Sequence, residues 1–113
     1  IKIVGNQKTK SVIHNVMFDR IEAGTFIIAG ALTNGNLRIL GLDPKILNKE
    51  LKILKQMGVK LKIKKSEIQV PESKSIKPIS IKTEPYPGFP TDLQAQIMVL
   101  MIKEINFMIE RTK

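Results

Sequence analysis

The chain has 113 residues, of which 42% are hydrophobic, and it carries a formal net charge of +9 with no cysteine and one histidine. This size and apolar content suit one domain with a core of its own. The absence of cysteine excludes disulfides and thiolate metal sites, and a lone histidine argues against a histidine-based one. No apolar run approaches the roughly 20 residues that a membrane-spanning helix needs. We therefore expect one domain that uses no metal or other cofactor.

The positive charge comes almost entirely from lysine and raises the hypothesis of a nucleic-acid-binding module. Many of these lysines fall in the middle of the chain, at Lys45, Lys49, Lys52, Lys55, Lys60, Lys62, Lys64 and Lys65. No aromatic residue lies between them, and one tyrosine and four phenylalanines in the whole chain leave few platforms on which bases could stack. We interpret most of these lysines as solvated faces of a helix and a hairpin, and keep a basic binding module as the alternative function.

The first expected elements are a strand over Ser11 to Met17 and a helix from Asp19 to about Thr33. His14 falls inside that strand and is interpreted as a strand residue rather than a catalytic base. Asp19 is the expected N-cap of the helix, and Asn34-Gly35 should end it. A short strand over residues 37–40 follows.

Arg20 stands in the first turn of that helix, where the helix dipole disfavours a cation. Such a side chain needs an anionic partner, which would be either a carboxylate of the protein or an anionic ligand. The alternative is an ordinary surface arginine.

A second helix is expected to begin at Asp43-Pro44, because aspartate is a common N-cap and proline suits the first helical position. Its inward face is expected to hold Leu47, Leu51, Leu54 and Met57, and Gly58 should end it in a left-handed conformation. The alternation that follows predicts a hairpin, with apolar positions Val59, Leu61, Ile63, Ile68 and Val70. A polar connector over residues 71–77 then leads to a strand over residues 79–83.

The last part of the chain begins with Pro85, Pro87 and Pro90, which make the approach to the third helix extended and stiff. Thr91 is the expected N-cap of this helix, with Gln94 completing a capping box. The helix is expected to run to about Glu104 and to be followed by a strand over residues 106–109.

Asp92 is then predicted at the first helical position, where free backbone N–H groups favour a negative charge. A carboxylate held between a stiff loop and an anchored helix suits a catalytic or ligand-orienting acid. The alternative is an ordinary first-turn acid, which contributes only about 0.3–1 kcal/mol of dipole stabilisation.

Three segments, His14–Thr25, Gly41–Gly58 and Pro87–Gln96, together resemble the enolpyruvyl transferases, and among them the branch whose acceptor is UDP-N-acetylglucosamine. The most specific run is Phe-Pro-Thr-Asp-Leu-Gln-Ala-Gln, and the resemblance covers nearly the whole chain. It implies an α/β (α+β) fold, the inside-out α/β barrel of repeated βαβαββ units with helices inside and sheets outside. Residues 1–113 would form a single partial domain, with about 11–75 as one unit and 76–113 as the start of the next.

The resemblance also implies an activity. The family branch transfers the enolpyruvyl group of phosphoenolpyruvate to the 3-hydroxyl of UDP-N-acetylglucosamine, with release of phosphate, as the first committed step of peptidoglycan synthesis in the cytoplasm. The role of general base at the sugar hydroxyl falls on Asp92, with Thr91 beside it in the substrate site and Arg20 as a further substrate-binding candidate. A helix N-terminus lowers the pKa of a carboxylate, whereas an efficient base at neutral pH needs a raised pKa. Asp92 could therefore act either as the base or as a group that orients the hydroxyl.

Parts of the family pattern are absent, including the cysteine that most members carry and a lysine-asparagine pair near the family's N-terminus. We therefore expect a fragment that does not turn over substrate without the remainder of the same enzyme chain, and whose exposed edges could drive self-association. A non-catalytic relative and the sister enzyme of the shikimate pathway remain further alternatives.

Overall fold

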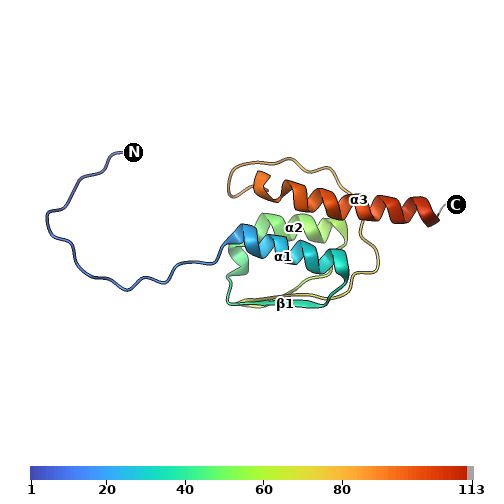
Figure 1. Ribbon diagram of the computed structural model, residues 1–113, viewed down its shortest axis with the longest axis horizontal. Helices are drawn as coiled ribbons and strands as arrows, with labels where there is room; N and C mark the ends of the chain where they lie inside the picture. Colours follow the sequence, from blue (N-terminus) through green and yellow to red (C-terminus); the bar gives the residue numbers. More distant parts are fainter. Residues whose placement is uncertain (112–113) are drawn as a thin grey trace.

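The computed structural model describes the backbone of residues 1–111 and the side chains of residues 1–103. The elements, in chain order, are α1 (Arg20–Thr33), β1 (Leu37–Leu40), the 3₁₀ helix η1 (Pro44–Leu47), α2 (Asn48–Met57), β2 (Lys62–Ile63), β3 (Glu67–Val70), the 3₁₀ helix η2 (Thr91–Leu93) and α3 (Gln94–Arg111). Figure 1 shows a compact body of helices and strands from which the N-terminal segment extends away.

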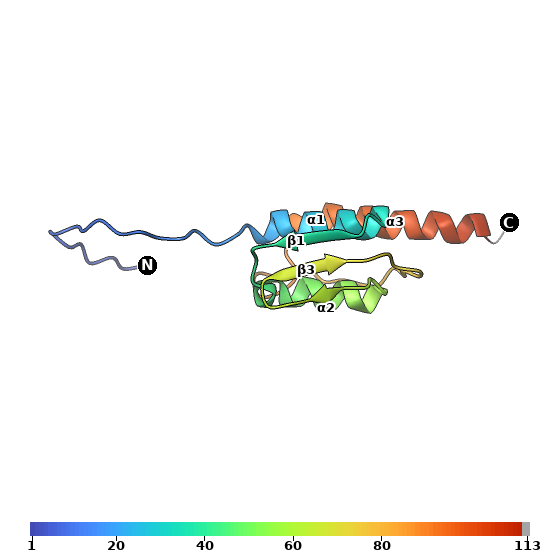
Figure 2. The same cartoon turned by 90° about the horizontal axis from the view of Figure 1, so that it is seen from below.

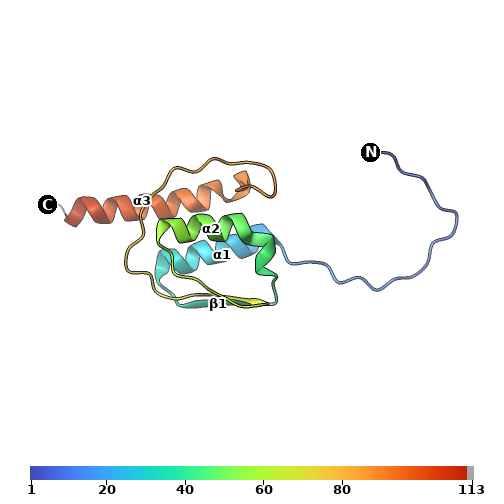
Figure 3. The ribbon, with the colours of Figure 1, turned by 180° about the vertical axis from the view of Figure 1, so that it is seen from behind.

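The body has a sheet on one side and helices on the other. The sheet is antiparallel with strand order β1-β3-β2, and Leu37 pairs with Val70 while Ile63 pairs with Ile68. Helices α1 and α2 lie behind one face of the sheet, as Figure 2 shows with the sheet toward the viewer. Helix α3 packs against α1 on the side away from the sheet (Figures 1 and 3). The helices are thus enclosed on the sheet side and on the α3 side.

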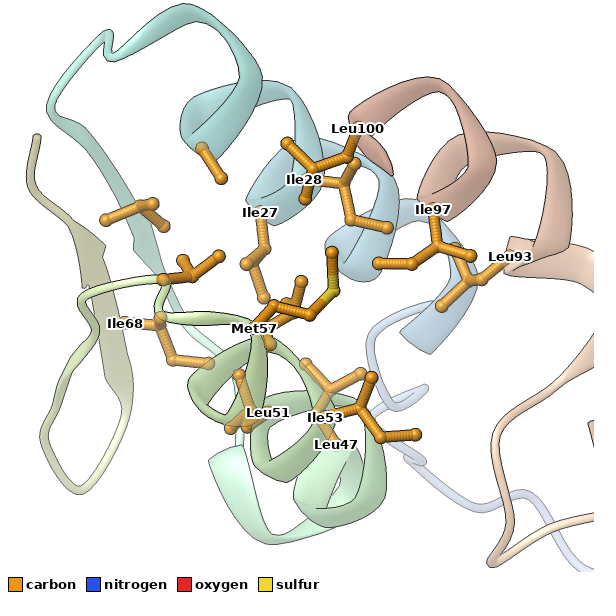
Figure 4. Close-up of a cluster of buried hydrophobic side chains, with 14 of the residues drawn as sticks. Ile27, Ile28, Leu47, Leu51, Ile53, Met57, Ile68, Leu93, Ile97 and Leu100 are labelled. Atoms are coloured by element: carbon orange, nitrogen blue, oxygen red, sulfur yellow. The ribbon is translucent and has the colours of Figure 1, made fainter. Parts of the chain in front are cut away.

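The core lies between these layers. Its fully buried large side chains are Ile27, Leu47, Leu54, Met57, Ile68, Val70, Phe89, Leu93 and Leu100. Figure 4 shows side chains from α1, α2, α3 and the sheet converging on this space. The inward face predicted for the second helix is confirmed, because Leu47, Leu51, Leu54 and Met57 are all buried.

Local sequence signals set both ends of the first two helices, as predicted. Asp19 Oδ1 accepts hydrogen bonds from the backbone N–H groups of Ile21 and Glu22 at 2.8 and 3.2 Å. Asn34 ends α1 in the left-handed conformation with φ of 52°. Asp43 accepts a hydrogen bond from the Lys45 N–H at 3.0 Å and precedes Pro44, although the first turn is 3₁₀ rather than α. The predicted hairpin is present as β2 and β3.

The strand predicted over Ser11 to Met17 is wrong. Residues 11–17 have no regular structure and are exposed, so His14 lies in an extended segment rather than in a sheet. A strand needs a neighbour to pair with its N–H and C=O groups. Among the residues that the structure describes, no strand lies beside this segment.

Two further strand predictions are wrong for related reasons. Residues 79–83 form only an isolated bridge, between Thr83 and Phe89. Residues 106–109 are helical, because α3 continues to Arg111. No glycine or proline follows Pro90 in the sequence, so nothing local stops the helix, and a helix satisfies its own backbone without a partner.

The predicted capping box at the start of the third helix is also wrong. Pro90 occupies the cap position of η2, and no side chain caps the turn. Thr91 is the first helical residue and Asp92 the second, one position later than expected. The fixed φ of Pro90 shapes the entry to the turn in place of a side-chain hydrogen bond.

Gly58 should be the least replaceable glycine of the body. Its φ is +99°, and an added Cβ would lie 2.3 Å from the Ser75 carbonyl oxygen. Gly41 has a φ of +77°, and no atom lies within 4 Å of such a Cβ. A substitution at Gly41 therefore measures the cost of the left-handed backbone conformation without a steric clash. We expect Gly41→Ala to lower the free energy of unfolding by about 1 kcal/mol and Gly58→Ala by about 3 kcal/mol or more. Urea unfolding of both variants checks this, and equal losses would contradict the close contact.

Stability should fall in acid through the ion pair between β1 and β3. Arg38 Nε donates to Glu67 Oε1 at 2.7 Å, and this hydrogen bond, with the charge of Arg38, lowers the pKa of Glu67 below its ordinary value of 4.5. The pair therefore contributes fully above about pH 4.5, and its contribution is lost as the pH falls through the lowered pKa. We expect the stability advantage of the wild type over Glu67→Gln to shrink between about pH 7 and pH 3. In an Arg38→Gln background, Glu67→Gln should no longer alter how the free energy of unfolding depends on pH. If Glu67→Gln has the same effect on that dependence with and without Arg38, the pairing is refuted.

Candidate active site

The loop before η2 is closed on itself by backbone hydrogen bonds. The Glu84 N–H donates to the Phe89 carbonyl oxygen at 2.9 Å, and the Gly88 N–H donates to the Pro85 carbonyl oxygen at 2.7 Å. The Phe89 side chain is 1% exposed and anchors the loop in the core. Prolines, hydrogen bonds and a buried aromatic ring therefore fix the residues that lead to Asp92.

The start of α3 is held against α1 by the packing of Leu93 against Gly24. Leu93 is fully buried, and an added Cβ at Gly24 would lie 2.6 Å from Leu93 Cδ1. Beside it, Gln96 Nε2 donates to Thr25 Oγ1 at 3.0 Å. The N-terminal halves of the two helices are consequently neighbours, although they are far apart in the sequence.

A hollow of about 260 Å³ lies where the starts of α1 and η2 meet the loop. It is lined by Arg20, Thr83, Glu84, Pro85, Tyr86, Pro90, Thr91 and Asp92. The structure therefore brings together Arg20, Thr91 and Asp92, the site residues predicted from the sequence. Thr91 and Asp92 are solvent-exposed, and both line the hollow.

Arg20 has a protein carboxylate as its partner, one of the two kinds expected. Its Nη1 donates to Glu50 Oε1 at 2.8 Å, and Glu50 is only 3% exposed. The guanidinium also lies 5.1 Å from the centre of the Tyr86 ring, within the range of a cation–π contact. The interpretation of Arg20 as an ordinary surface arginine is wrong, because it links α1, α2 and the loop.

Glu50 and Tyr86 are functional candidates that the sequence reasoning missed. Glu50 carried a readable signal, because it lies three residues after Leu47 and four before Leu54, on the inward stripe of α2. A charged residue on an apolar stripe needs a buried partner. Tyr86 carried no comparable signal, since its contact with Arg20 depends on the fold of the loop.

The hollow has a negative balance of charge. Arg20 is compensated by Glu50, and Glu84 lies 3.8 Å from Lys82. Asp92 has no ion-pair partner among the described side chains. Such a place favours a neutral hydroxyl group, which can donate a hydrogen bond to a carboxylate, over a phosphate, which the carboxylate would repel.

Other kinds of site find little support in the part of the chain that the structure describes. No three histidine, aspartate or glutamate side chains gather as metal ligands within it. None of the described helices is both long enough and apolar enough to cross a bilayer.

Comparisons with known proteins show the family of the chain. The profile of the family EPSP synthase (3-phosphoshikimate 1-carboxyvinyltransferase) matches residues 1–111. The UDP-N-acetylglucosamine 1-carboxyvinyltransferase of Pelagibacter ubique (strain HTCC1062) is 58% identical over 103 residues, which cover 91% of this chain and 25% of that protein. The protein of the same name from Koribacter versatilis (strain Ellin345) is 47% identical over 100 residues, which cover 88% of this chain and 23% of that protein.

A solved structure adds a fold comparison. The enolpyruvyl transferase NikO from Streptomyces tendae matches with a TM-score of 0.65 and 30% identity, over 75% of this chain and 21% of that one. The fold is thus part of the inside-out α/β barrel of the enolpyruvyl transferases, as the resemblance predicted. The chain belongs to the EPSP synthase family. It spans about a quarter of the length of the curated relatives named above.

The Arg20–Glu50 pair should couple α1 to α2 energetically. Glu50→Gln keeps the shape of the side chain but leaves the guanidinium without its counter-charge. We expect this change to lower the free energy of unfolding by about 1–3 kcal/mol. A double-mutant cycle with Arg20→Met, followed by urea unfolding, should give a coupling energy of similar size. Strictly additive effects would mean that the pair contributes nothing to joining the helices.

Proposed function

We propose that this chain forms part of an enzyme that transfers the enolpyruvyl group of phosphoenolpyruvate to the 3-hydroxyl of UDP-N-acetylglucosamine. The observation that carries the proposal is the hollow at which Asp92, Thr91 and Arg20 meet. The names of relatives at 58% and 47% identity support the same reaction. Such an enzyme acts in the cytoplasm at the first committed step of peptidoglycan synthesis.

Asp92 is the proposed catalytic residue of this chain. The acceptor hydroxyl must lose its proton as its oxygen bonds to the enolpyruvyl group, and a carboxylate beside the hydroxyl can accept that proton or orient the O–H group. Thr91 offers a second hydrogen-bonding group at the same rim. Arg20 binds substrate through the guanidinium N–H groups that Glu50 leaves free, while its guanidinium keeps the cation–π contact with Tyr86.

The hollow suits one part of the nucleotide sugar. Its volume of about 260 Å³ is below the ~300–1,000 Å³ of pockets that enclose a drug-sized ligand. Its negative balance favours the uncharged sugar ring over the diphosphate. The cations that hold phosphoenolpyruvate and the diphosphate are therefore assigned to other parts of the enzyme.

The exposed apolar side chains of the body support a larger domain around it. Phe26 on α1 is 52% exposed, and Met98, Val99 and Ile102 on α3 are 49%, 52% and 53% exposed. Such surfaces are typical of an interface. We assign residues 11–75 to one βαβαββ unit and residues 76–113 to the start of the next, with further units covering these faces.

The experiment compares two carboxylates that border the same hollow. In the intact enzyme carrying this chain, Asp92→Asn should lower kcat by about 10²–10⁴, the range of lost acid–base catalysis, with UDP-N-acetylglucosamine as acceptor. Glu84→Gln removes an equal charge from the rim and should change kcat by less than about threefold, because Glu84 holds no proton of the reaction. Phosphate release measured at saturating substrate gives both values.

The outcomes separate the possibilities. Equal losses of kcat in Asp92→Asn and Glu84→Gln would mean that the negative charge of the hollow matters, rather than Asp92 itself. Near-normal turnover of Asp92→Asn would remove this residue from the chemistry. Turnover with shikimate 3-phosphate in place of UDP-N-acetylglucosamine would assign the enzyme to the other branch of the family.

A further inference from the structure

A groove rich in lysine lies on α2 and the β2–β3 hairpin and shares no lining residue with the hollow at Asp92. It consists of two adjoining hollows of about 570 and 840 Å³, which have Pro44, Lys45 and Ile63 in common. The lysines along both are Lys45, Lys52, Lys55, Lys64 and Lys65. We call this surface the lysine groove.

The positive charge of the lysine groove is not neutralised within the described part of the chain. None of its lysines forms an ion pair there. Asp43 is the one acid among the lining residues and accepts the capping hydrogen bond of η1, so five lysines face a single carboxylate. The groove therefore attracts an anionic partner at physiological ionic strength.

The floor of the groove is apolar. Leu51 and Pro44 are buried beneath it, and Ile63 is 39% exposed on the edge strand β2. Lysines thus surround a concave strip of hydrocarbon. A ligand that matches it carries negative groups at its sides and an apolar group in its middle.

We propose that the lysine groove binds an acidic peptide segment of a partner protein, with carboxylates on the lysines and an apolar side chain on the floor. Nucleic acid fits less well, because neither arginine nor an aromatic residue is among the lining residues, and bases would find no stacking surface. A membrane fits less well because the groove is concave, whereas an anionic bilayer offers a flat surface.

The position beside β2 agrees with this choice of partner. Strand β2 has only two residues and stands at the edge of the sheet. Lysines next to an edge strand hinder pairing with chains of like charge. The same lysines favour an extended acidic chain, whose carboxylates they can reach without leaving solvent.

The test uses the intact protein carrying this chain and four labelled probes. These are a peptide of alternating glutamate and leucine, the same peptide with serine for leucine, a single-stranded oligonucleotide of equal charge, and phosphatidylglycerol vesicles. Lys45→Glu with Lys52→Glu reverses two charges in the groove. Lys74→Glu with Lys77→Glu makes the same change in charge at exposed lysines outside it. Melting temperatures of all variants verify folding.

We expect the glutamate–leucine peptide to bind most tightly of the probes. The groove double variant should weaken it about tenfold or more, and the control double variant less than about threefold. Ile63→Ser should weaken the glutamate–leucine peptide but not the glutamate–serine one. The proposal is overturned by absence of peptide binding, by equal weakening in both double variants, or by tighter groove-dependent binding of the oligonucleotide or the vesicles.

Discussion

The contact between Leu93 and Gly24 is the constraint on which the geometry of the site depends. Leu93 follows Asp92 directly, and Gly24 lies one turn after Arg20, so burying the leucine against the glycine also places the acid near the arginine. A β-carbon at position 24 would meet the end of the Leu93 side chain, which would have to shift within the core. A contact between apolar atoms therefore sets the positions of Arg20 and Asp92. A buried leucine fits its neighbours in few arrangements, whereas exposed charged side chains adopt many.

The Arg20–Glu50–Tyr86 cluster adds a second constraint. It joins α1, α2 and the loop through one guanidinium, which donates a hydrogen bond to Glu50 and lies over the Tyr86 ring. A buried carboxylate is costly unless it is paired, so Glu50 tolerates few arrangements other than this one. The cluster thus specifies where Arg20 lies, and Asp92 stays the lining acid without an ion-pair partner among the described side chains.

The sequence predicted those features whose physical causes are local. Asp19, Asp43-Pro44 and Gly58 act on neighbouring backbone groups, and the helix ends they predicted are confirmed. The strands predicted over residues 11–17, 79–83 and 106–109 are wrong, because a strand exists only beside a partner. In the described part of the chain those segments have no such partner, apart from the single bridge at Thr83. Periodicity reports which face is apolar and says nothing of whether a neighbour is present.

The candidate site shows the same division. Asp92, Thr91 and Arg20 were named from their positions in helix starts, and the structure places them around one hollow. Glu50 reaches that cluster from a helix 30 residues away in sequence, and Tyr86 from a loop whose path is set by its own hydrogen bonds. Such contacts depend on tertiary packing, which no short-range pattern encodes.

The distribution of charge explains how a strongly basic chain can present an acid to the proposed acceptor sugar. The net charge of +9 attracts the phosphates of both proposed substrates over distances of about a Debye length, roughly 8–10 Å in physiological salt. No lysine lines the hollow at Asp92, and the charges that do line it sum to a negative value. A phosphate drawn to the protein is therefore repelled from this one place, while a sugar hydroxyl is not. The local negative balance is therefore compatible with both roles proposed for Asp92, removal of the hydroxyl proton and orientation of the hydroxyl.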